Sequence, residues 1–311
     1  MKIIFMGTPE FAAHFLEHLH SGPHQVLAVV TQPDRPVGRG RVLTPPPVKA
    51  KALELGLPVL QPASVKDASF AEDLKRWDAD LFVIVAFSIL PKAVLACSKF
   101  GAINVHGSLL PKYRGAAPVQ WAIANGESST GVSVFLLDEK MDHGPLLEQR
   151  NIPIDLQDTA SSVLEKMVKP GCDALDVAID RISNGEIKEL LAQEHEKASP
   201  APKLKKEDGK IDFLKSALEI HNRIRAFFPW PGGFCSFNGK VAYFRKTIPA
   251  KRNLGISPGE GKFLDGKLFV GTGNGELEIL EIQLEGKRAM SAADFLRGIQ
   301  KKDALCFKTI A

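Results

Sequence analysis

The chain contains 311 residues, of which 44% are hydrophobic and 24% charged, and this is enough apolar material for two ordinary hydrophobic cores. Its formal net charge of +4 hides an asymmetry, because residues 1–200 carry 20 basic and 24 acidic side chains while residues 201–311 carry 20 basic and 12 acidic. No run approaches the roughly 20 apolar residues that span a bilayer, and the first residues resemble a strand more than a signal peptide. We therefore expect a cytoplasmic protein whose basic half binds an anionic partner.

The use of cysteine argues against two further classes of protein. The four cysteines, at positions 97, 172, 235 and 306, lie far apart and form no Cys-x-x-Cys pair. Such spacing predicts neither a disulfide framework nor a zinc site. We therefore expect no protein-bound metal.

Short apolar runs alternate with helical patterns through the first half of the chain. In chain order we expect strands at residues 3–6, 26–31, 58–61, 81–86, 102–106, 130–138 and 146–154. Helical patterns lie between or after them, at residues 9–20, 48–55, 70–76, 92–97 and 159–182. The run 81–86 is apolar without alternation, which is typical of a strand covered on both faces. These repeated β-α units predict an α/β fold, namely a Rossmann-like, mostly parallel, doubly wound sheet.

The first β-α turn does not have the composition of a dinucleotide loop. Thr8 is a suitable N-cap for the following helix, and Pro9 suits its first turn. A dinucleotide fingerprint needs three spaced glycines, whereas this turn has only Gly7. A nicotinamide dehydrogenase is therefore disfavoured. The later glycine-rich run at residues 271–275 lies between two expected strands, so we interpret it as a hairpin turn.

The second half begins with a polar, proline-containing stretch that has no helical or strand period. On this pattern we expect a catalytic domain at residues 1–190, a linker at 191–210 and a second domain at 211–311. Within the second domain we expect a helix at residues 214–227 and strands at 233–238, 241–248, 261–263, 267–270 and 276–283. Short strands separated by glycine-rich turns predict a small antiparallel β-barrel.

A cluster of polar residues follows the fifth expected strand. Asn104 and His106 are two residues apart, so they share one face of a strand, at the carboxyl end where open α/β sheets bind ligands. An asparagine amide can donate to a developing oxyanion, and a histidine can move a proton near neutral pH. For an isolated Asn-x-His pair, however, the more common interpretation is that both side chains are simply hydrogen-bonded within a turn.

The longer segment resembles the signature of folate-dependent formyltransferases, which is Asn-x-His followed by Ser-Leu-Leu-Pro and a later glycine. The resemblance implies that Asn104 and His106 are catalytic together with a downstream aspartate, for which Asp142 is the candidate. It also implies that the loop holds 10-formyltetrahydrofolate as co-substrate, and the loop residues carried over are Ser108, Leu109, Leu110 and Pro111. The family's usual threonine is replaced here by His143, for which a solvated loop position is favoured over a second catalytic histidine.

The acceptor of the formyl group has to be inferred from other segments. Arg35, Arg39 and Arg41 lie in a basic loop that resembles the insertion of those family members that formylate methionyl-initiator-tRNA, although solvated surface charge is the ordinary interpretation of such a loop. A related loop occurs in some formyltetrahydrofolate dehydrogenases, but a chain ending at residue 311 leaves no room for a dehydrogenase domain. The similarity continues at residues 203–213, 224–233 and 286–296, and it implies that the barrel is OB-like and contacts tRNA.

The resemblance thus implies transfer of a formyl group from 10-formyltetrahydrofolate to the α-amino group of methionyl-initiator-tRNA by a monomeric enzyme of translation initiation. Two alternatives remain open at this point. One is a formyltransferase for a small amine, such as a nucleotide-linked amino sugar or glycinamide ribonucleotide. The other is an RNA-binding module on an inactive scaffold. Trp230 can serve as a base-stacking platform, although its flanking prolines favour a structural corner.

Overall fold

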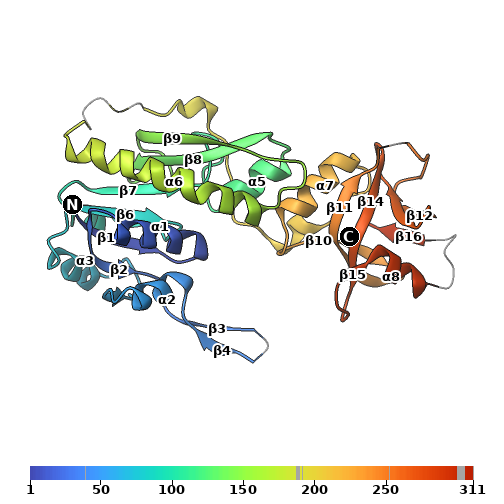
Figure 1. Cartoon of the computed structure of the whole chain (residues 1–311), viewed down its shortest axis with the longest axis horizontal. Helices are drawn as coiled ribbons and strands as arrows, with labels where there is room; N and C mark the ends of the chain where they lie inside the picture. Colours follow the sequence, from blue (N-terminus) through green and yellow to red (C-terminus); the bar gives the residue numbers. More distant parts are fainter. Residues whose placement is uncertain (39, 187–189, 191, 252, 300–304, 311) are drawn as a thin grey trace. The chain divides into compact units, whose positions relative to one another are not determined.

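The computed structural model describes the whole chain except residues 39, 187–189, 191, 252, 300–304 and 311 (Figure 1). The chain forms two compact units. The first, here called the sheet unit, comprises Met1–Pro118, Thr130–Ile152 and Leu164–Pro202. The second, the barrel unit, comprises Val119–Ser129, Pro153–Val163 and Lys203–Ala311. Within the described residues, no helix combines the length and the apolar character needed to cross a bilayer.

Among the described residues of the first half, seven strands form one sheet in the order β5-β2-β1-β6-β7-β8-β9. The strands are β1 (Lys2–Gly7), β2 (Gln25–Val30), β5 (Val59–Leu60), β6 (Leu81–Val85), β7 (Ala102–His106), β8 (Ser129–Leu136) and β9 (Leu146–Pro153). The pairs from β5 through β7 are parallel, whereas β8 runs antiparallel to β7. The prediction of a Rossmann-like, mostly parallel sheet is confirmed.

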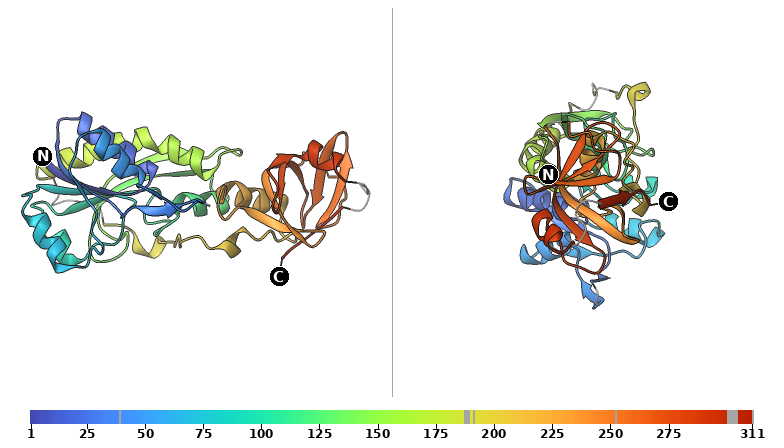
Figure 2. Two further views of the ribbon diagram at one scale, coloured as in Figure 1. Left: turned by 90° about the horizontal axis from the view of Figure 1, so that it is seen from below. Right: turned by 90° about the vertical axis from the view of Figure 1, so that its right-hand side faces the viewer.

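Helices cover both faces of this sheet (Figure 2). One face carries α1 (Glu10–Ser21), α2 (Pro47–Glu54) and α6 (Ala160–Ser183). The other carries α3 (Ala68–Lys75) and α4 (Lys92–Leu95), whose buried Phe70 and Leu74 pack against Phe82 and Ile84 of β6. Because both faces are covered, β6 is buried along its whole length, as its unbroken apolar sequence predicts.

Two local predictions in this half are wrong. Pro9, not Thr8, occupies the N-cap of α1, and the hydroxyl of Thr8 is buried without a hydrogen-bond partner among the described residues. The basic segment expected as a loop contains a short hairpin, β3 (Arg35–Val37) paired antiparallel with β4 (Val42–Thr44). Strands of three residues are too short to show a period in the sequence, so this hairpin could not be recognised there.

The barrel unit is a closed antiparallel barrel, as predicted. Within the part of the chain that the structure describes, the closed ring has six strands in the order β11-β10-β16-β12-β13-β14, with β14 pairing back onto β11. The elements are α7 (Ala217–Ala226), β10 (Gly233–Phe237), β11 (Lys240–Pro249), β12 (Glu260–Leu264), β13 (Lys267–Gly271), β14 (Glu276–Leu284), β15 (Met290–Ser291), α8 (Ala292–Arg297) and β16 (Leu305–Lys308). The last three were not expected from the sequence. A short helix, α5 (Pro118–Ala124), was also missed.

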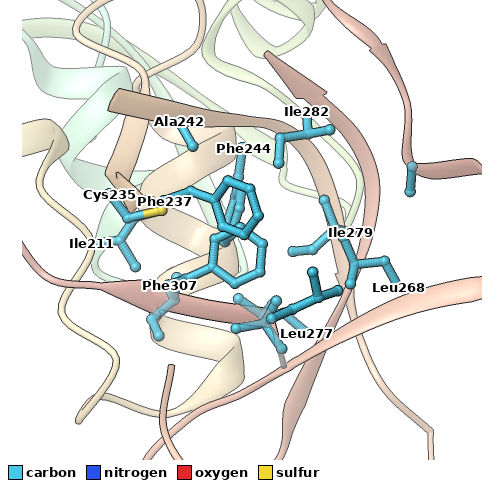
Figure 3. Close-up of a cluster of buried hydrophobic side chains, with 14 of the residues drawn as sticks. Ile211, Cys235, Phe237, Ala242, Phe244, Leu268, Leu277, Ile279, Ile282 and Phe307 are labelled. Carbon is cyan, nitrogen blue, oxygen red and sulfur yellow. The ribbon is translucent and has the colours of Figure 1, made fainter. Parts of the chain in front are cut away.

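Aromatic and aliphatic side chains fill the barrel (Figure 3). Phe307 of β16 stacks on Phe237 at a ring-centroid distance of 4.9 Å and meets Phe244 edge-on at 5.3 Å. The glycine-rich run after β13 is the hairpin turn that the sequence predicts, closed by a bond from Thr272 N to the carbonyl of Gly275. The barrel therefore has an apolar core built from these side chains.

Trp230, singled out in the sequence, lies between Pro229 and Pro231 and is 56% exposed. Its ring therefore contributes little to the core of the barrel unit.

Candidate active site

The strand β7 has the bounds that the sequence predicts and ends at the expected histidine. Since side chains two apart on a strand share a face, Asn104 and His106 project on the same side of the sheet. Asn104 is half-buried and His106 is only 6% exposed. The end of β7 lies beside β6 on one side and β8 on the other, so these two polar groups are set in a low-dielectric surround.

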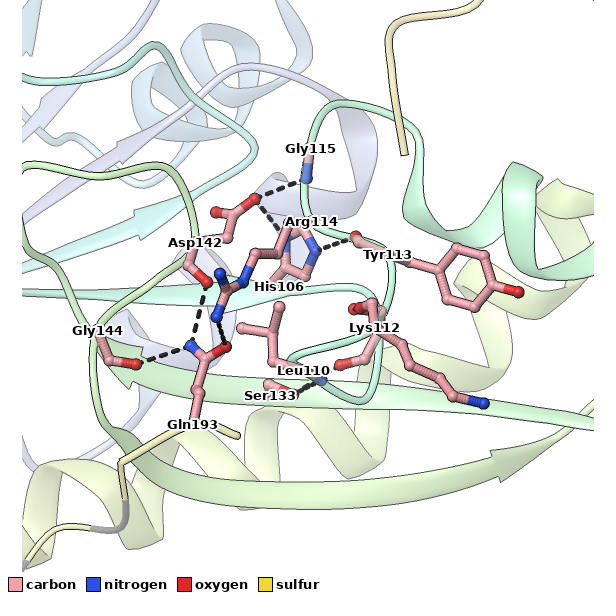
Figure 4. A network of polar contacts seen from close by, with 11 residues as sticks. His106, Leu110, Lys112, Tyr113, Arg114, Gly115, Ser133, Asp142, Gly144 and Gln193 are labelled. Carbon is pink, nitrogen blue, oxygen red and sulfur yellow. Dashed lines mark hydrogen bonds and ion pairs between the residues drawn. The ribbon is translucent and has the colours of Figure 1, made fainter. Parts of the chain in front are cut away.

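The ring of His106 is held between two acceptors (Figure 4). Its Nε2 lies 2.9 Å from the carbonyl oxygen of Tyr113, and its Nδ1 lies 3.7 Å from Oδ2 of Asp142. Because a carbonyl oxygen only accepts, Nε2 carries a proton and donates it to Tyr113. A second proton, on Nδ1, would face the carboxylate at ion-pair distance. The arrangement can therefore hold the ring in one orientation through a cycle of proton uptake and release.

Asp142 lies on the loop between β8 and β9 and adopts a left-handed backbone conformation with φ of +50°. Its Oδ2 accepts a 2.8 Å hydrogen bond from the backbone N–H of Gly115. The same oxygen faces His106, so the N–H of Gly115 helps to fix which carboxylate oxygen the imidazole meets. The structure thus brings His106 and Asp142 into contact from segments 36 residues apart in the sequence.

The predicted folate loop is held in shape by its own polar groups. Ser108 is fully buried, and its hydroxyl donates to the carbonyl of Lys112 at 2.7 Å. Leu110 is 3% exposed, its N–H donates to the hydroxyl of Ser133, and its carbonyl accepts from Gln149. Leu109 and Pro111 are half-buried. Ser108 and Leu110 therefore set the shape of the loop, while contact of all four residues with folate stays a prediction.

Gln193 reaches the Asp142 loop from a distant part of the chain. It is 4% exposed, and its Nε2 donates to the backbone carbonyls of Asp142 at 3.0 Å and Gly144 at 2.7 Å. Its Oε1 accepts from Nη2 of Arg114 at 2.6 Å. These bonds connect the Asp142 loop to the loop that follows His106.

Two histidines stack beside this network. The rings of His143 and His195 lie 3.9 Å apart and nearly parallel, and Nδ1 of His143 contacts Oδ2 of Asp138 at 2.6 Å. Desolvation and the electrostatic influence of His143 and Arg114 lower the pKa of His195 below its usual range. His143 lies in a loop, as expected, and its partly exposed side chain contacts Asp138 and His195.

Residues 193–202, which composition assigns to a linker, are part of the sheet unit. We call them the strap. The backbone N–H of Tyr113 donates to the hydroxyl of Ser199, the N–H of Arg114 donates to the carbonyl of Ser199, and Ala201 N donates to the carbonyl of Arg114. The strap combines these backbone bonds with side-chain contacts of Gln193 and His195, and its polar, proline-containing composition gives no period from which a docked segment could be predicted. Ser133 also went unnoticed, although it lies opposite His106 in the antiparallel register of β7 and β8.

Of the arginines proposed for RNA contact, Arg35 begins β3 and Arg41 directly precedes β4. Arg35 and Arg41 are exposed, as are the apolar Val42 and Leu43 of β4, and Arg39 lies outside the described residues. Arg35 donates to the side-chain oxygen of Gln32 at 3.2 Å. In the described ranges, no group of three or more His, Cys, Asp or Glu side chains is arranged to hold a metal ion.

Comparison with known proteins identifies the family of this chain. The profile of the family "Formyl transferase" matches residues 1–179, and that of "Formyl transferase, C-terminal domain" matches residues 203–300. A methionyl-tRNA formyltransferase of Koribacter versatilis is 45% identical over 307 residues, covering 98% of this chain and 97% of the relative. One of Desulfotalea psychrophila is 45% identical over 303 residues, covering 96% and 93%.

A solved sugar 3N-formyltransferase, crystallised with dTDP and 5-N-formyl-THF, superposes with a TM-score of 0.68 at 22% identity, covering 93% of this chain and 99% of that one. At that identity the likeness shows a shared fold. The matches to the relatives run through both units and include the segment with Asn104, His106 and Asp142. The chain therefore belongs to the formyl transferase family.

Proposed function

We propose that this enzyme transfers a formyl group from 10-formyltetrahydrofolate to the α-amino group of methionyl-initiator-tRNA, which gives N-formylmethionyl-tRNA for translation initiation. The observation that carries the proposal is 45% identity to proteins named methionyl-tRNA formyltransferase over 98% of the chain. The charge distribution supports it, because residues 201–311 carry 20 basic and only 12 acidic side chains, as suits a polyanionic acceptor.

The chemistry that we assign to the site is acyl transfer through a tetrahedral oxyanion. The uncharged amine attacks the formyl carbon, the new C–N bond forms, and the bond from that carbon to folate N10 breaks. The side-chain amide of Asn104 donates to the oxyanion, and His106 carries the proton lost by the amine to the leaving N10. Asp142 orients the ring of His106 through its 3.7 Å contact with Nδ1.

We assign the formyl donor to the region beside the loop of residues 108–111. Its closed hydrogen-bond pattern, with Ser108 and Leu110 turned inward, leaves a fixed surface of backbone and of the half-buried Leu109 and Pro111 for the donor to meet. A fixed surface suits catalysis, because a donor held in one position reacts without a further loss of conformational freedom.

We assign part of the tRNA contact to Arg35, Arg39 and Arg41. Since each phosphate contact releases condensed counterions, the KM for tRNA should rise steeply with salt. Replacing both Arg35 and Arg41 by alanine should flatten this dependence, whereas Arg76→Ala, an exposed arginine already paired with Asp73 on α3, is the matched control. A salt dependence equal to wild type in the double variant would remove the hairpin from the tRNA site.

The acceptor is tested with a panel of amines. The purified protein is incubated with 10-formyltetrahydrofolate and, separately, methionyl-initiator-tRNA, free methionine, a nucleotide-linked amino sugar and glycinamide ribonucleotide. Formyl transfer is followed by mass spectrometry of the acceptor. We expect turnover with the aminoacyl-tRNA and little with the small amines. Faster turnover with either nucleotide-linked amine would replace the proposed acceptor, and no turnover with any amine would favour a non-enzymatic RNA-binding role.

The catalytic assignment is tested by Asn104→Ala and Asp142→Ala. Loss of one oxyanion donor typically lowers turnover by about 10²- to 10³-fold, and we expect such a loss for Asn104→Ala. We expect Asp142→Ala to abolish most transfer while the protein stays folded by circular dichroism. Near-normal turnover in either variant would take that residue out of the catalytic set.

A further inference from the structure

We propose that Gln193 is a positioning residue for formyl transfer, because its side-chain amide fixes the backbone of Asp142 and thereby the carboxylate that faces His106. The inference rests on the proposed function, since it assumes that Asp142 takes part in the reaction. It adds a residue from the strap to the machinery of the site, one that touches no reacting atom and acts through Asp142.

Asp142 needs to be held from outside its own segment. It is one of the non-glycine residues with positive φ, at +50°, a conformation that only surrounding contacts maintain. One hydrogen bond fixes its carboxylate, from the N–H of Gly115, and one fixes its backbone carbonyl, from Nε2 of Gln193. The second proton of the same amide nitrogen goes to the carbonyl of Gly144, so a single side chain clamps the loop on both sides of His143.

The side-chain amide of Gln193 is held at both its nitrogen and its oxygen. Both protons of its Nε2 are donated, and its Oε1 accepts from Arg114 at 2.6 Å, which determines the orientation of the amide. The residue is 4% exposed. Because both donors are used within the protein and the side chain is almost entirely buried, the geometry points to a positioning role and not to substrate contact.

The contacts close into a ring around Asp142 (Figure 4). From the carbonyl of Asp142 the ring runs through Gln193 to the guanidinium of Arg114, along the chain to the N–H of Gly115, and back to the Asp142 carboxylate. A displacement of Gln193 would therefore move the carboxylate relative to His106. This coupling distinguishes Gln193 from a residue that only adds stability to the fold.

The imidazole of His195 contacts two parts of this ring of hydrogen bonds, the Arg114 guanidinium and the loop that carries Asp142. Since a guanidinium only donates, the 2.9 Å contact between Arg114 Nη2 and His195 Nδ1 requires an unprotonated Nδ1 on His195. Burial and the neighbouring charges of His143, Arg114 and Lys140 lower the pKa of His195, which agrees with this neutral form. Its ring stacks on His143, the neighbour of Asp142, and so the strap contacts the loop at a second point.

Gln193→Glu tests the proposal with almost no change in shape. The carboxylate still accepts from Arg114 but cannot donate to the two carbonyls. We expect kcat, normalised to the number of folate-binding sites measured with 5-formyltetrahydrofolate, to fall about 10- to 100-fold, the effect typical of a misplacement of about 1 Å. KM for tRNA and Kd for folate should stay within about 3-fold of wild type. Gln193→Met, which also loses the contact with Arg114, is the second variant, and the exposed neighbour Glu194→Gln is the matched control.

A double-mutant cycle separates positioning from mere stability. If Gln193 acts through Asp142, Gln193→Glu should lower the residual kcat of an Asp142→Ala enzyme by less than about 2-fold. A further loss of 10-fold in that background, or a wild-type kcat in both Gln193 variants, would overturn the inference. High activity of Asp142→Ala alone would instead refute the catalytic assignment on which the inference depends.

Discussion

Gly115 is a position where a single added methyl group should disturb the contact between the strap and the Asp142 loop. Its φ is +126°, where L side chains are rarely found, and an added Cβ would lie 2.5 Å from the carbonyl oxygen of Ala201. An ordinary contact of this kind is at least 3.4 Å, so Gly115→Ala forces the strap and the loop apart by about 1 Å. The N–H of Gly115 is the donor to Asp142, and this displacement is therefore transmitted directly to the carboxylate for which we propose a catalytic role.

We expect Gly115→Ala to lower kcat about 100-fold, because a misplacement of about 1 Å can cost that much in an oriented reaction. The assay is steady-state formylation of methionyl-tRNA at saturating 10-formyltetrahydrofolate. Thermal unfolding should show a destabilisation of about 1–3 kcal/mol, the usual cost of a sparsely populated backbone conformation.

Gly101→Ala is the matched control for this experiment. Gly101 also has positive φ, at +75°, and belongs to the sheet unit, but an added Cβ there meets nothing within 4 Å. We expect this variant to lose a comparable amount of stability and to keep its turnover. If Gly115→Ala retained turnover within about 3-fold of wild type, or if both variants lost it equally, the idea that strap contact sets the position of Asp142 would be refuted.

Two further predictions concern the barrel unit. His221 is 2% exposed, its Nε2 donates to the carbonyl of Leu156 and its Nδ1 accepts from the hydroxyl of Thr247, while burial lowers its pKa. The unfolded chain therefore takes up a proton at a higher pH than the folded barrel does, and the free energy of unfolding should fall as pH drops below about 6.5, by at most ~1.4 kcal/mol per pH unit. In His221→Gln the urea midpoints measured at pH 7.5 and 5.5 should lie closer together than in wild type. A difference between the two midpoints equal to that of wild type would contradict the assignment. Phe307→Ala should lower the free energy of unfolding of the barrel by about 3–5 kcal/mol, since the 1% exposed ring of Phe307 packs on the rings of Phe237 and Phe244. A decrease below about 1 kcal/mol in urea unfolding would show that β16 does not close the core.

Strands in the middle of the sheet could be predicted from the sequence because they are buried on both faces and therefore apolar at most positions. The run of β6 is apolar at every position, and β7 was located to the residue. The elements that were missed depend on partners distant in sequence. β16 has four residues, alternately buried and exposed, and it becomes a strand because it pairs with both β10 and β12 and closes the barrel. Nothing within four residues distinguishes such a strand from a terminal loop.

The candidate site likewise contains residues that could be predicted from the sequence and a segment that could not. Asn104, His106 and Asp142 could be proposed from short motifs, because their side chains carry recognisable chemistry. The strap could not, because its polar, proline-containing composition is that of a linker and part of its binding is through backbone atoms of residues such as Ser199 and Ala201. Composition records which side chains avoid water, whereas the hydrogen bonds of a docked backbone leave no trace in it.

Asp142 shows why the motif alone does not make a site. Aspartate tolerates the left-handed region better than most residues, but it does not prefer that region, so its own segment cannot determine the observed φ of +50°. The contacts that do so come from Gly115, which follows the histidine motif, and from Gln193 in the strap. The reactive geometry is therefore a product of three segments that meet only after the sheet unit has folded. Substitutions in the strap should consequently change kcat more strongly than they change the affinity for either substrate.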